Sequence, residues 1–130
     1  MPRTITDHTV EGDSVNHQLT INVVDEPGVG GANHEYHIDW LTEHGGAFDE
    51  KPNHLLVSFQ NGPIKEHGTN GVTHEALLAI VIDRLRSFQA GPYSCRDNAV
   101  ALTHCEEALM WLQRRTRERI KRGVEGTHTK

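Results

Sequence analysis

The chain has 130 residues, of which 35% are hydrophobic and 5% aromatic, and its formal net charge is −5. This length predicts a single domain over residues 1–130, and the acidic balance argues against a protein that coats long nucleic acid through general positive charge. The low apolar content favours a chain that completes its core by oligomerisation. No apolar run is long enough to span a membrane, so we expect no membrane partner.

The N-terminal half, over residues 17–63, has the pattern of a small β-sheet. Residues 1–16 are polar and predict a flexible arm that has room for a short strand. Three later segments alternate polar and apolar side chains, as half-buried strands do: 17–24, 34–40 and 54–60. The glycine-rich loop 25–33 contains neither GxGxxG nor GK[ST], so it does not predict a phosphate-binding loop.

A first helix is predicted from Thr73, a suitable N-cap, to Gln89. One stripe along it is apolar and comprises Leu78, Val81, Ile82, Leu85 and Phe88. Leu77 and Ile80 lie outside that stripe, so the first half of the helix is apolar on every face. Such a helix is buried on more than one side, here by the sheet or by another chain.

A second helix is predicted from Ser94 to about Lys121, with Ser94 as N-cap, Asp97 completing a capping box, and a stop at Gly123. Its seam, spaced four and three residues apart, comprises Asn98, Leu102, Cys105, Leu109, Leu112, Thr116 and Arg119. The short break at Ala90-Gly91-Pro92 predicts an antiparallel helical hairpin over 73–122, followed by a tail at 123–130. The fold class is therefore α+β: a small N-terminal antiparallel sheet and then a long two-helix hairpin that oligomerises.

Neither the cysteines nor the histidines predict a catalytic or metal site. Cys95 and Cys105 lie about 15 Å apart along one predicted helix, too far for a disulfide, and free thiols without a signal peptide predict a reducing cytosol. The histidines lack the spacing of metal ligands, and no nucleophile elbow or paired-carboxylate motif is present. We expect exposed imidazoles, no metal, no cofactor and no catalytic residue. The histidines stand at positions 8, 17, 34, 37, 44, 54, 67, 74, 104 and 128.

Basic residues are concentrated at the end of the second helix, where six of the 13 Lys and Arg fall within nine positions. The plain interpretation is a solvated helix end whose charge complements the helix dipole. Arg115 and Arg119, however, are four residues apart, so both point to one side and can hold one anion. The six are Arg114, Arg115, Arg117, Arg119, Lys121 and Arg122.

A ligand pocket built from these arginines requires two chains. Asn98 lies roughly 25–30 Å from the arginines along the helix, and Phe88 lies near Asn98 across the hairpin. If two hairpins pack antiparallel, Phe88 and Asn98 of one chain meet Arg115 and Arg119 of the other. A two-fold axis then creates two identical pockets per dimer.

The block VTHEALLAIVIDRLRSFQAGPYSCRDNAVALTHCEEALMWLQRRTRERIKRGVEGT resembles the helical hairpin of a phage family, the first-described Tad sponges that oppose Thoeris defence. That hairpin is shared with the anti-CBASS cyclic-nucleotide sponges. The resemblance covers about residues 57–127 and includes the SFQNGP turn. The first 50 or so residues match only in being a variable β-rich part.

The resemblance implies a non-enzymatic sponge in the host cytoplasm that binds a cyclised ADP-ribose isomer made by a Thoeris TIR-domain protein. By matching motif, Phe88 would pack on adenine, Asn98 would meet a polar edge, and Arg115 and Arg119 would take the pyrophosphate. Family members assemble as dimers, and some form hexamers that also hold cyclic oligonucleotides at separate sites. For that second site this sequence offers only Lys65 near Pro63.

Two other hypotheses stay open. One is a small phage nucleic-acid-binding or regulatory protein whose basic helix end contacts phosphates; the acidic net charge and the lack of aromatics among the arginines argue against it. The other, weaker hypothesis is a phosphodiesterase that uses the histidines to cut a cyclic nucleotide.

Overall fold

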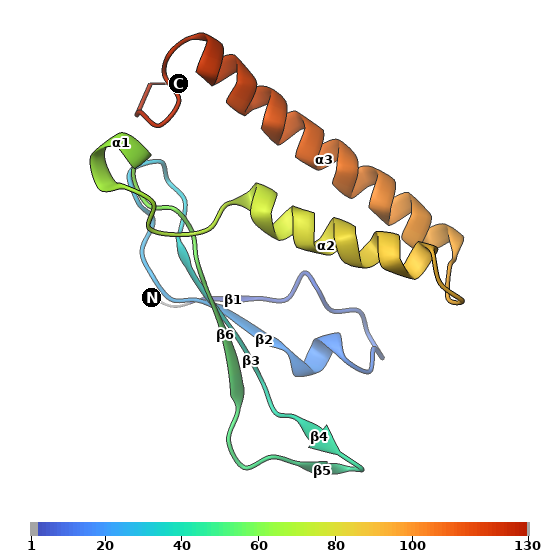
Figure 1. Cartoon of the computed structure of the whole chain (residues 1–130). Helices are drawn as coiled ribbons and strands as arrows, with labels where there is room; N and C mark the ends of the chain where they lie inside the picture. The colour runs from blue at the N-terminus through green and yellow to red at the C-terminus, as the bar shows by residue number, and fades with distance from the viewer. Residues whose placement is uncertain (1–2, 130) are drawn as a thin grey trace. The chain divides into compact units, whose positions relative to one another are not determined.

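The computed structural model describes residues 3–129, which form two compact units, one up to Asn61 and one from Gly62 onward. The first unit is an antiparallel sheet and the second is helical, so the predicted α+β class and the order of sheet then hairpin are confirmed (Figure 1). Whether the units make a single domain stays a prediction. No helix of residues 3–129 combines the length and apolar character needed to cross a membrane.

The sheet has four antiparallel strands in the order β1-β2-β3-β6. Their bounds are β1 Arg3–Ile5, β2 Thr20–Val23, β3 Glu35–Trp40 and β6 Asn53–Ser58. The three predicted strands are thus present, with β3 pairing to both β2 and β6. β1 lies in the segment expected as a flexible arm, where it pairs with β2. A separate two-stranded hairpin of β4 Glu43–His44 and β5 Ala47–Phe48 was not predicted.

The alternation of side chains places one apolar face on the sheet. Val23, Tyr36 and Val57 are in register across three strands, and Val23 is 1% exposed. The ring of Tyr36 meets Phe59 edge to face at 5.5 Å between centroids. Such a contact adds to the burial of both rings.

The predicted start of the first strand, at residue 17, is wrong. Residues Asn16–Gln18 form a 3-10 turn, and β2 begins only at Thr20. The cause is Asp13, whose carboxylate accepts the backbone N–H groups of His17 at 2.7 Å and Val10 at 2.9 Å. These hydrogen bonds hold the chain in a turn ahead of β2, as Asp side chains commonly do.

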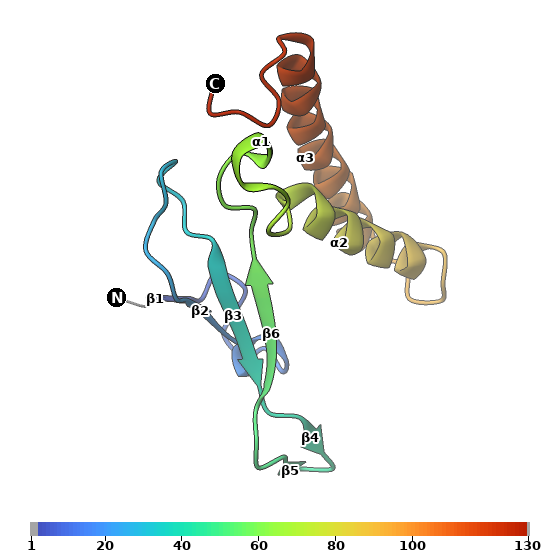
Figure 2. The same cartoon turned by 60° about the vertical axis from the view of Figure 1, so that its left-hand side comes forward.

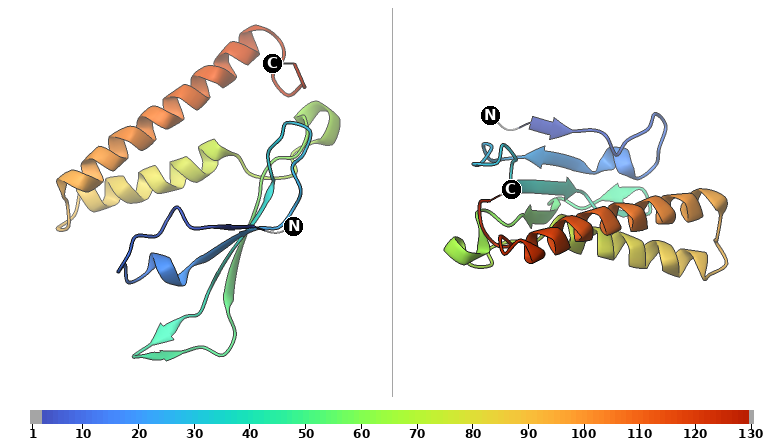
Figure 3. Two further views of the ribbon diagram at one scale, coloured as in Figure 1. Left: turned by 180° about the vertical axis from the view of Figure 1, so that it is seen from behind. Right: turned by 90° about the horizontal axis from the view of Figure 1, so that it is seen from above.

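The helical unit contains a short α1, Ile64–His67, and then the hairpin of α2, His74–Gln89, and α3, Arg96–Lys121. Figures 2 and 3 show α2 and α3 antiparallel and side by side, with α3 continuing past the start of α2. Thr73 caps α2 as predicted, since its Oγ1 accepts the N–H of Ala76 at 3.1 Å.

The predicted N-cap of the second helix, Ser94, is wrong by one residue. Cys95 is the cap, and its Sγ accepts the N–H of Asn98 at 3.5 Å. The side chain of Gln89 accepts the N–H of Cys95 at 3.1 Å and so holds that residue extended at the helix start. Asp97 is then the second residue of the helix, one position early for a capping box. At the other end Gly123, with φ of +72°, follows the helix as predicted.

The predicted seam of the second helix is its less exposed face. Leu102, Cys105, Leu109, Leu112 and Thr116 are half-buried. On α2 the residue that is buried is Ile82, 3% exposed, whereas Ile80 is 66% exposed. Within the helical unit the side of α2 that carries Ile80 is therefore exposed, and its burial by the sheet or by another chain stays a prediction.

Candidate ligand-binding site

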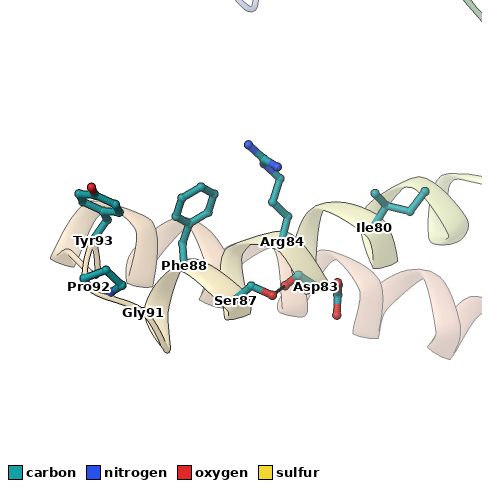
Figure 4. A pocket seen from close by; sticks show the side chains of 8 residues that line it. All are labelled: Ile80, Asp83, Arg84, Ser87, Phe88, Gly91, Pro92 and Tyr93. Carbon is teal, nitrogen blue, oxygen red and sulfur yellow. Dashed lines mark hydrogen bonds between the residues drawn. The ribbon is translucent and has the colours of Figure 1, made fainter.

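An open pocket of about 540 Å³ lies at the loop end of the hairpin (Figure 4). This volume falls within the range of about 300–1,000 Å³ that is usual for small-molecule sites. We call it the tip pocket. The last three turns of α2 and the loop that follows supply its lining: Ile80, Asp83, Arg84, Ser87, Phe88, Gly91, Pro92 and Tyr93.

Phe88, one of the four residues predicted for the ligand, lines the tip pocket and is 37% exposed. The guanidinium carbon of Arg84, one turn earlier, is 5.1 Å from the centroid of the Phe88 ring. This is a cation–π contact. In Figure 4 the side chains of Ile80, Arg84, Phe88 and Tyr93 project to the same side of the hairpin. The tip pocket thus presents rings and a cation together.

Asn98, the second predicted residue, is half-buried in the first turn of α3. It shares the loop end of the hairpin with Phe88, as predicted, because α2 and α3 are antiparallel (Figure 1). It does not line the tip pocket. The two residues therefore share an end of the hairpin rather than one concave surface of a single chain.

Arg115 and Arg119 lie near the opposite end of α3, and their surroundings differ. Arg115 is exposed, whereas Arg119 is 8% exposed. The guanidinium group of Arg119 donates to the main-chain oxygens of Val124 at 3.0 Å, Thr127 at 2.9 Å and Thr129. Its Nε is also 3.5 Å from a carboxylate oxygen of Glu125. Three of the five N–H groups that an arginine carries are thus used by the segment 124–129.

The segment 124–129, expected only as a tail, folds back onto its own unit. Its Val124 N–H donates to the main-chain oxygen of Arg119 at 3.0 Å, and the oxygen of Gly126 accepts the N–H of Lys65 at 3.2 Å. His128 pairs with Glu66 of α1 at 3.6 Å. The buried arginine and this segment therefore stabilise each other.

Two charged contacts organise the rest of the hairpin. Arg86 of α2 and Glu106 of α3 form an ion pair at 2.7 Å, which links the two helices. Arg114 stacks over the ring of Trp111 at 5.6 Å, and Trp111 is 66% exposed. The exposed arginines of the basic run for which the structure gives no side-chain partner among residues 3–129 are Arg115, Arg117 and Arg122.

The histidines are not all the exposed imidazoles that we expected. His8 and His34 are half-buried, and His54 and His17 pair with Asp39 and Asp13. Within residues 3–129 no group of three or more His, Cys, Asp or Glu is arranged to hold a metal ion. The tip pocket itself is lined by one acid, Asp83, and by neither histidine nor cysteine.

One chain cannot bring all four predicted residues to one small ligand. Asn98 precedes Arg115 by 17 residues on a continuous helix, which corresponds to about 25 Å. The geometry thus agrees with the premise of the two-chain pocket, and the pocket itself stays a prediction.

Comparison with known proteins identifies the family of the hairpin. The sequence profile of the Acb2/Tad1 hairpin domain matches residues 51–117, about half of the chain. The chain belongs to the Acb2/Tad1 hairpin family. The match includes Phe88, Asn98 and Arg115 and stops before Arg119. This family match and the expected resemblance agree.

A relative from Bacillus phage SBSphiJ7, named Thoeris anti-defense 1, is 61% identical over 74 residues. That alignment covers 57% of this chain and 52% of the relative. The chain thus matches about half the length of this relative.

Sequence reasoning missed Arg84 and Tyr93 as pocket residues. Arg84 stands four residues before Phe88, so helical spacing alone puts the two on one face. Tyr93, 76% exposed, follows the Gly91-Pro92 break, and an aromatic residue left in a tight polar loop is the signal that could have identified it.

Proposed function

We propose that this protein is a non-enzymatic sponge of the host cytoplasm that binds and sequesters a cyclic ADP-ribose isomer and so blocks bacterial Thoeris anti-phage defence. The observation that carries the proposal is the 61% identity to a phage protein named Thoeris anti-defense 1. Membership of the hairpin family supports it, because the matched residues contain the tip pocket and the exposed Arg115.

The chemistry of the hairpin suits the two halves of such a ligand. At the loop end, the Phe88 ring offers a face on which adenine stacks, and Asn98 offers an amide for a polar edge of the nucleotide. At the other end, Arg115 offers a planar cation for a pyrophosphate. Because the ends are about 25 Å apart in one chain, a second chain has to supply the anion-binding end.

Arg119 would take part differently from Arg115. Three of its N–H groups donate to the segment 124–129, so it has few donors left for phosphate. Arg119 would bind the anion through its remaining N–H groups, or after one carbonyl of the segment is released. Arg115, already exposed, needs no such change and would provide most of the contact.

Assembly of several chains is part of the proposal. Ile80, Met110 and Trp111 are each more than 60% exposed in the single chain, and apolar side chains of that size favour burial against another surface. A dimer, or a hexamer that also holds cyclic oligonucleotides, would supply that surface.

The test is an uptake and release experiment. The protein is incubated with a cyclised ADP-ribose, separated from free ligand, denatured by heat, and the released material is identified by mass spectrometry. The proposal expects the ligand to come back unchanged and to regain its ability to activate a Thoeris effector. Recovery of a cleaved product would indicate a phosphodiesterase instead. Absence of uptake, together with retention of a labelled oligonucleotide, would favour the nucleic-acid-binding alternative.

A further inference from the structure

We propose that Arg84 and Tyr93 are base-binding residues that act with Phe88 in the tip pocket. This inference rests on the proposed function, because it assigns residues for the adenine of the same ligand. It also specifies how a shallow surface on one hairpin could hold a planar base.

Arg84 and Phe88 lie against each other in the lining of the tip pocket. With the guanidinium carbon 5.1 Å from the ring centroid, the cation fixes one face of Phe88 and limits the rotamers of that ring. A ring held in place before binding loses less conformational entropy when a base stacks on it. The planar guanidinium also extends the stacking surface beyond the edge of the ring. Arg84 therefore acts both through Phe88 and on the base.

Tyr93 adds a second aromatic ring to the tip pocket. Its side chain is 76% exposed although most of its surface is apolar, and nothing within the helical unit covers it. It lines the same pocket as Phe88, and both rings project to the same side in Figure 4. A purine between or across these two rings would bury both, which is how single bases are held by proteins that bind them through stacking.

The charged residues in the lining of the tip pocket are Asp83 and Arg84. Asp83 lies at the other edge of the tip pocket. Its negative carboxylate would repel a pyrophosphate placed there. Ser87 holds this edge in place by donating from its hydroxyl to the main-chain oxygen of Asp83 at 3.0 Å. Arg84 is the one positive side chain of the lining, and it is directed at a ring. The tip pocket thus favours the uncharged base over the phosphates.

The test compares four variants with the wild-type protein by calorimetry against a cyclised ADP-ribose. Tyr93→Ala and Arg84→Gln are the test variants and Phe88→Ala the reference. Arg96→Gln is the matched control, because Arg96 is an exposed arginine in the first turn of α3 that does not line the pocket. Tyr93→Ala should weaken binding about 5- to 100-fold, the range for loss of one stacking ring. Arg84→Gln should weaken it about 3- to 10-fold, and Arg96→Gln by less than about 2-fold.

A second measurement separates stacking from a merely structural effect. In proton NMR the adenine H2 and H8 signals of the bound ligand should move upfield with the wild-type protein, and this shift should shrink in Tyr93→Ala. Inorganic pyrophosphate, used as a competitor without a base, should have the same inhibition constant with Arg84→Gln as with wild type. A selective loss of pyrophosphate competition in Arg84→Gln would make Arg84 a phosphate ligand and overturn its assignment.

The outcomes distinguish this inference from the proposed function. Wild-type protein that binds the cyclic ligand while Tyr93→Ala and Arg84→Gln bind like Arg96→Gln would overturn the inference and leave the function intact. Wild-type protein that binds no cyclised ADP-ribose would overturn both.

Discussion

The guanidinium group of Arg119 donates a 2.9 Å hydrogen bond to the main-chain oxygen of Thr127, eight residues further along the chain. Arg119 also donates to the main-chain oxygens of Val124 and Thr129. The residue that we expected to bind an anion therefore also holds the C-terminal segment in its folded position. The buried guanidinium group thus stabilises the C-terminal segment, because three of its N–H groups donate to main-chain oxygens of that segment.

The first prediction compares Arg119 with Arg115. Arg119→Ala should lower the free energy of unfolding by about 2–4 kcal/mol, because three part-buried main-chain carbonyls lose a charged donor. Arg115→Ala removes an exposed side chain and should lower it by less than about 0.5 kcal/mol. Denaturant titration at equal protein concentration measures both. Equal stability losses in the two variants would contradict the structural role of Arg119.

The second prediction concerns ligand affinity at Arg115. Arg115→Ala should weaken binding of the cyclic ligand by roughly 2–4 kcal/mol, because the charge-assisted bonds to a partly desolvated pyrophosphate are lost. Arg115→Lys should restore only part of this, since lysine lacks the planar fork. Arg117→Ala serves as control, because Arg117 points to another side of α3 and should alter mainly the salt dependence. Calorimetry at two salt concentrations measures these effects, and full rescue by lysine would argue against a bidentate contact.

Most of the helical half could be predicted from the sequence, because its periodicity and the cap of its first long helix are local. The seam from Asn98 to Thr116 and the Thr73 cap follow from residues a few positions apart. The position of the second cap does not, because it depends on a bond from Cys95 to Gln89 in the other helix. Burial of Arg119 depends on carbonyls of the tail, and main-chain carbonyls carry no sequence signal.

The third prediction concerns acid stability of the sheet unit. Burial alone would raise the pKa of Asp25, but the N–H groups of His34 and Glu35 outweigh it, and the pKa lies below its usual value of 3.8. A lowered pKa contributes stability that is present above about pH 4 and is lost as the pH falls through the folded-state pKa. The difference in unfolding free energy between wild type and Asp25→Asn should therefore shrink below pH 3.8. Urea titrations from pH 2.5 to 6 measure it, and a difference that is independent of pH would contradict the assignment.

The fourth prediction concerns assembly. The exposed apolar residues of α2 and α3, among them Ile80 and Trp111, predict an obligate oligomer of antiparallel hairpins. Light scattering at micromolar concentration should report a dimer or a higher assembly. Ile80→Glu should shift it toward smaller species, whereas Glu107→Lys, on an exposed position of α3, should leave it unchanged. A well-folded wild-type monomer would remove the two-chain pocket.

The fifth prediction tests whether the pocket is shared between chains. Asn98→Ala and Arg115→Ala should each abolish or weaken binding in their own homodimers, because every pocket then lacks one of its two halves. When the two variants are mixed and allowed to exchange subunits, a mixed dimer contains one pocket with both substitutions and one with neither. The second pocket is wild type, so calorimetry of an equal mixture should recover wild-type affinity.

The number of tight binding sites tests whether the pocket is shared. Restored pockets bind with wild-type affinity, and defective pockets only lower the number of tight sites per chain. With free exchange, half of the dimers are mixed and each has one intact pocket of two, so about one quarter of all pockets should bind at wild-type strength. Exchange is confirmed beforehand by native mass spectrometry of chains with distinct tags. If exchange is complete and no tight sites return, Asn98 and Arg115 do not meet across an interface. A pocket built within one chain, or from two copies of the same end of the hairpin, would then replace the two-chain arrangement.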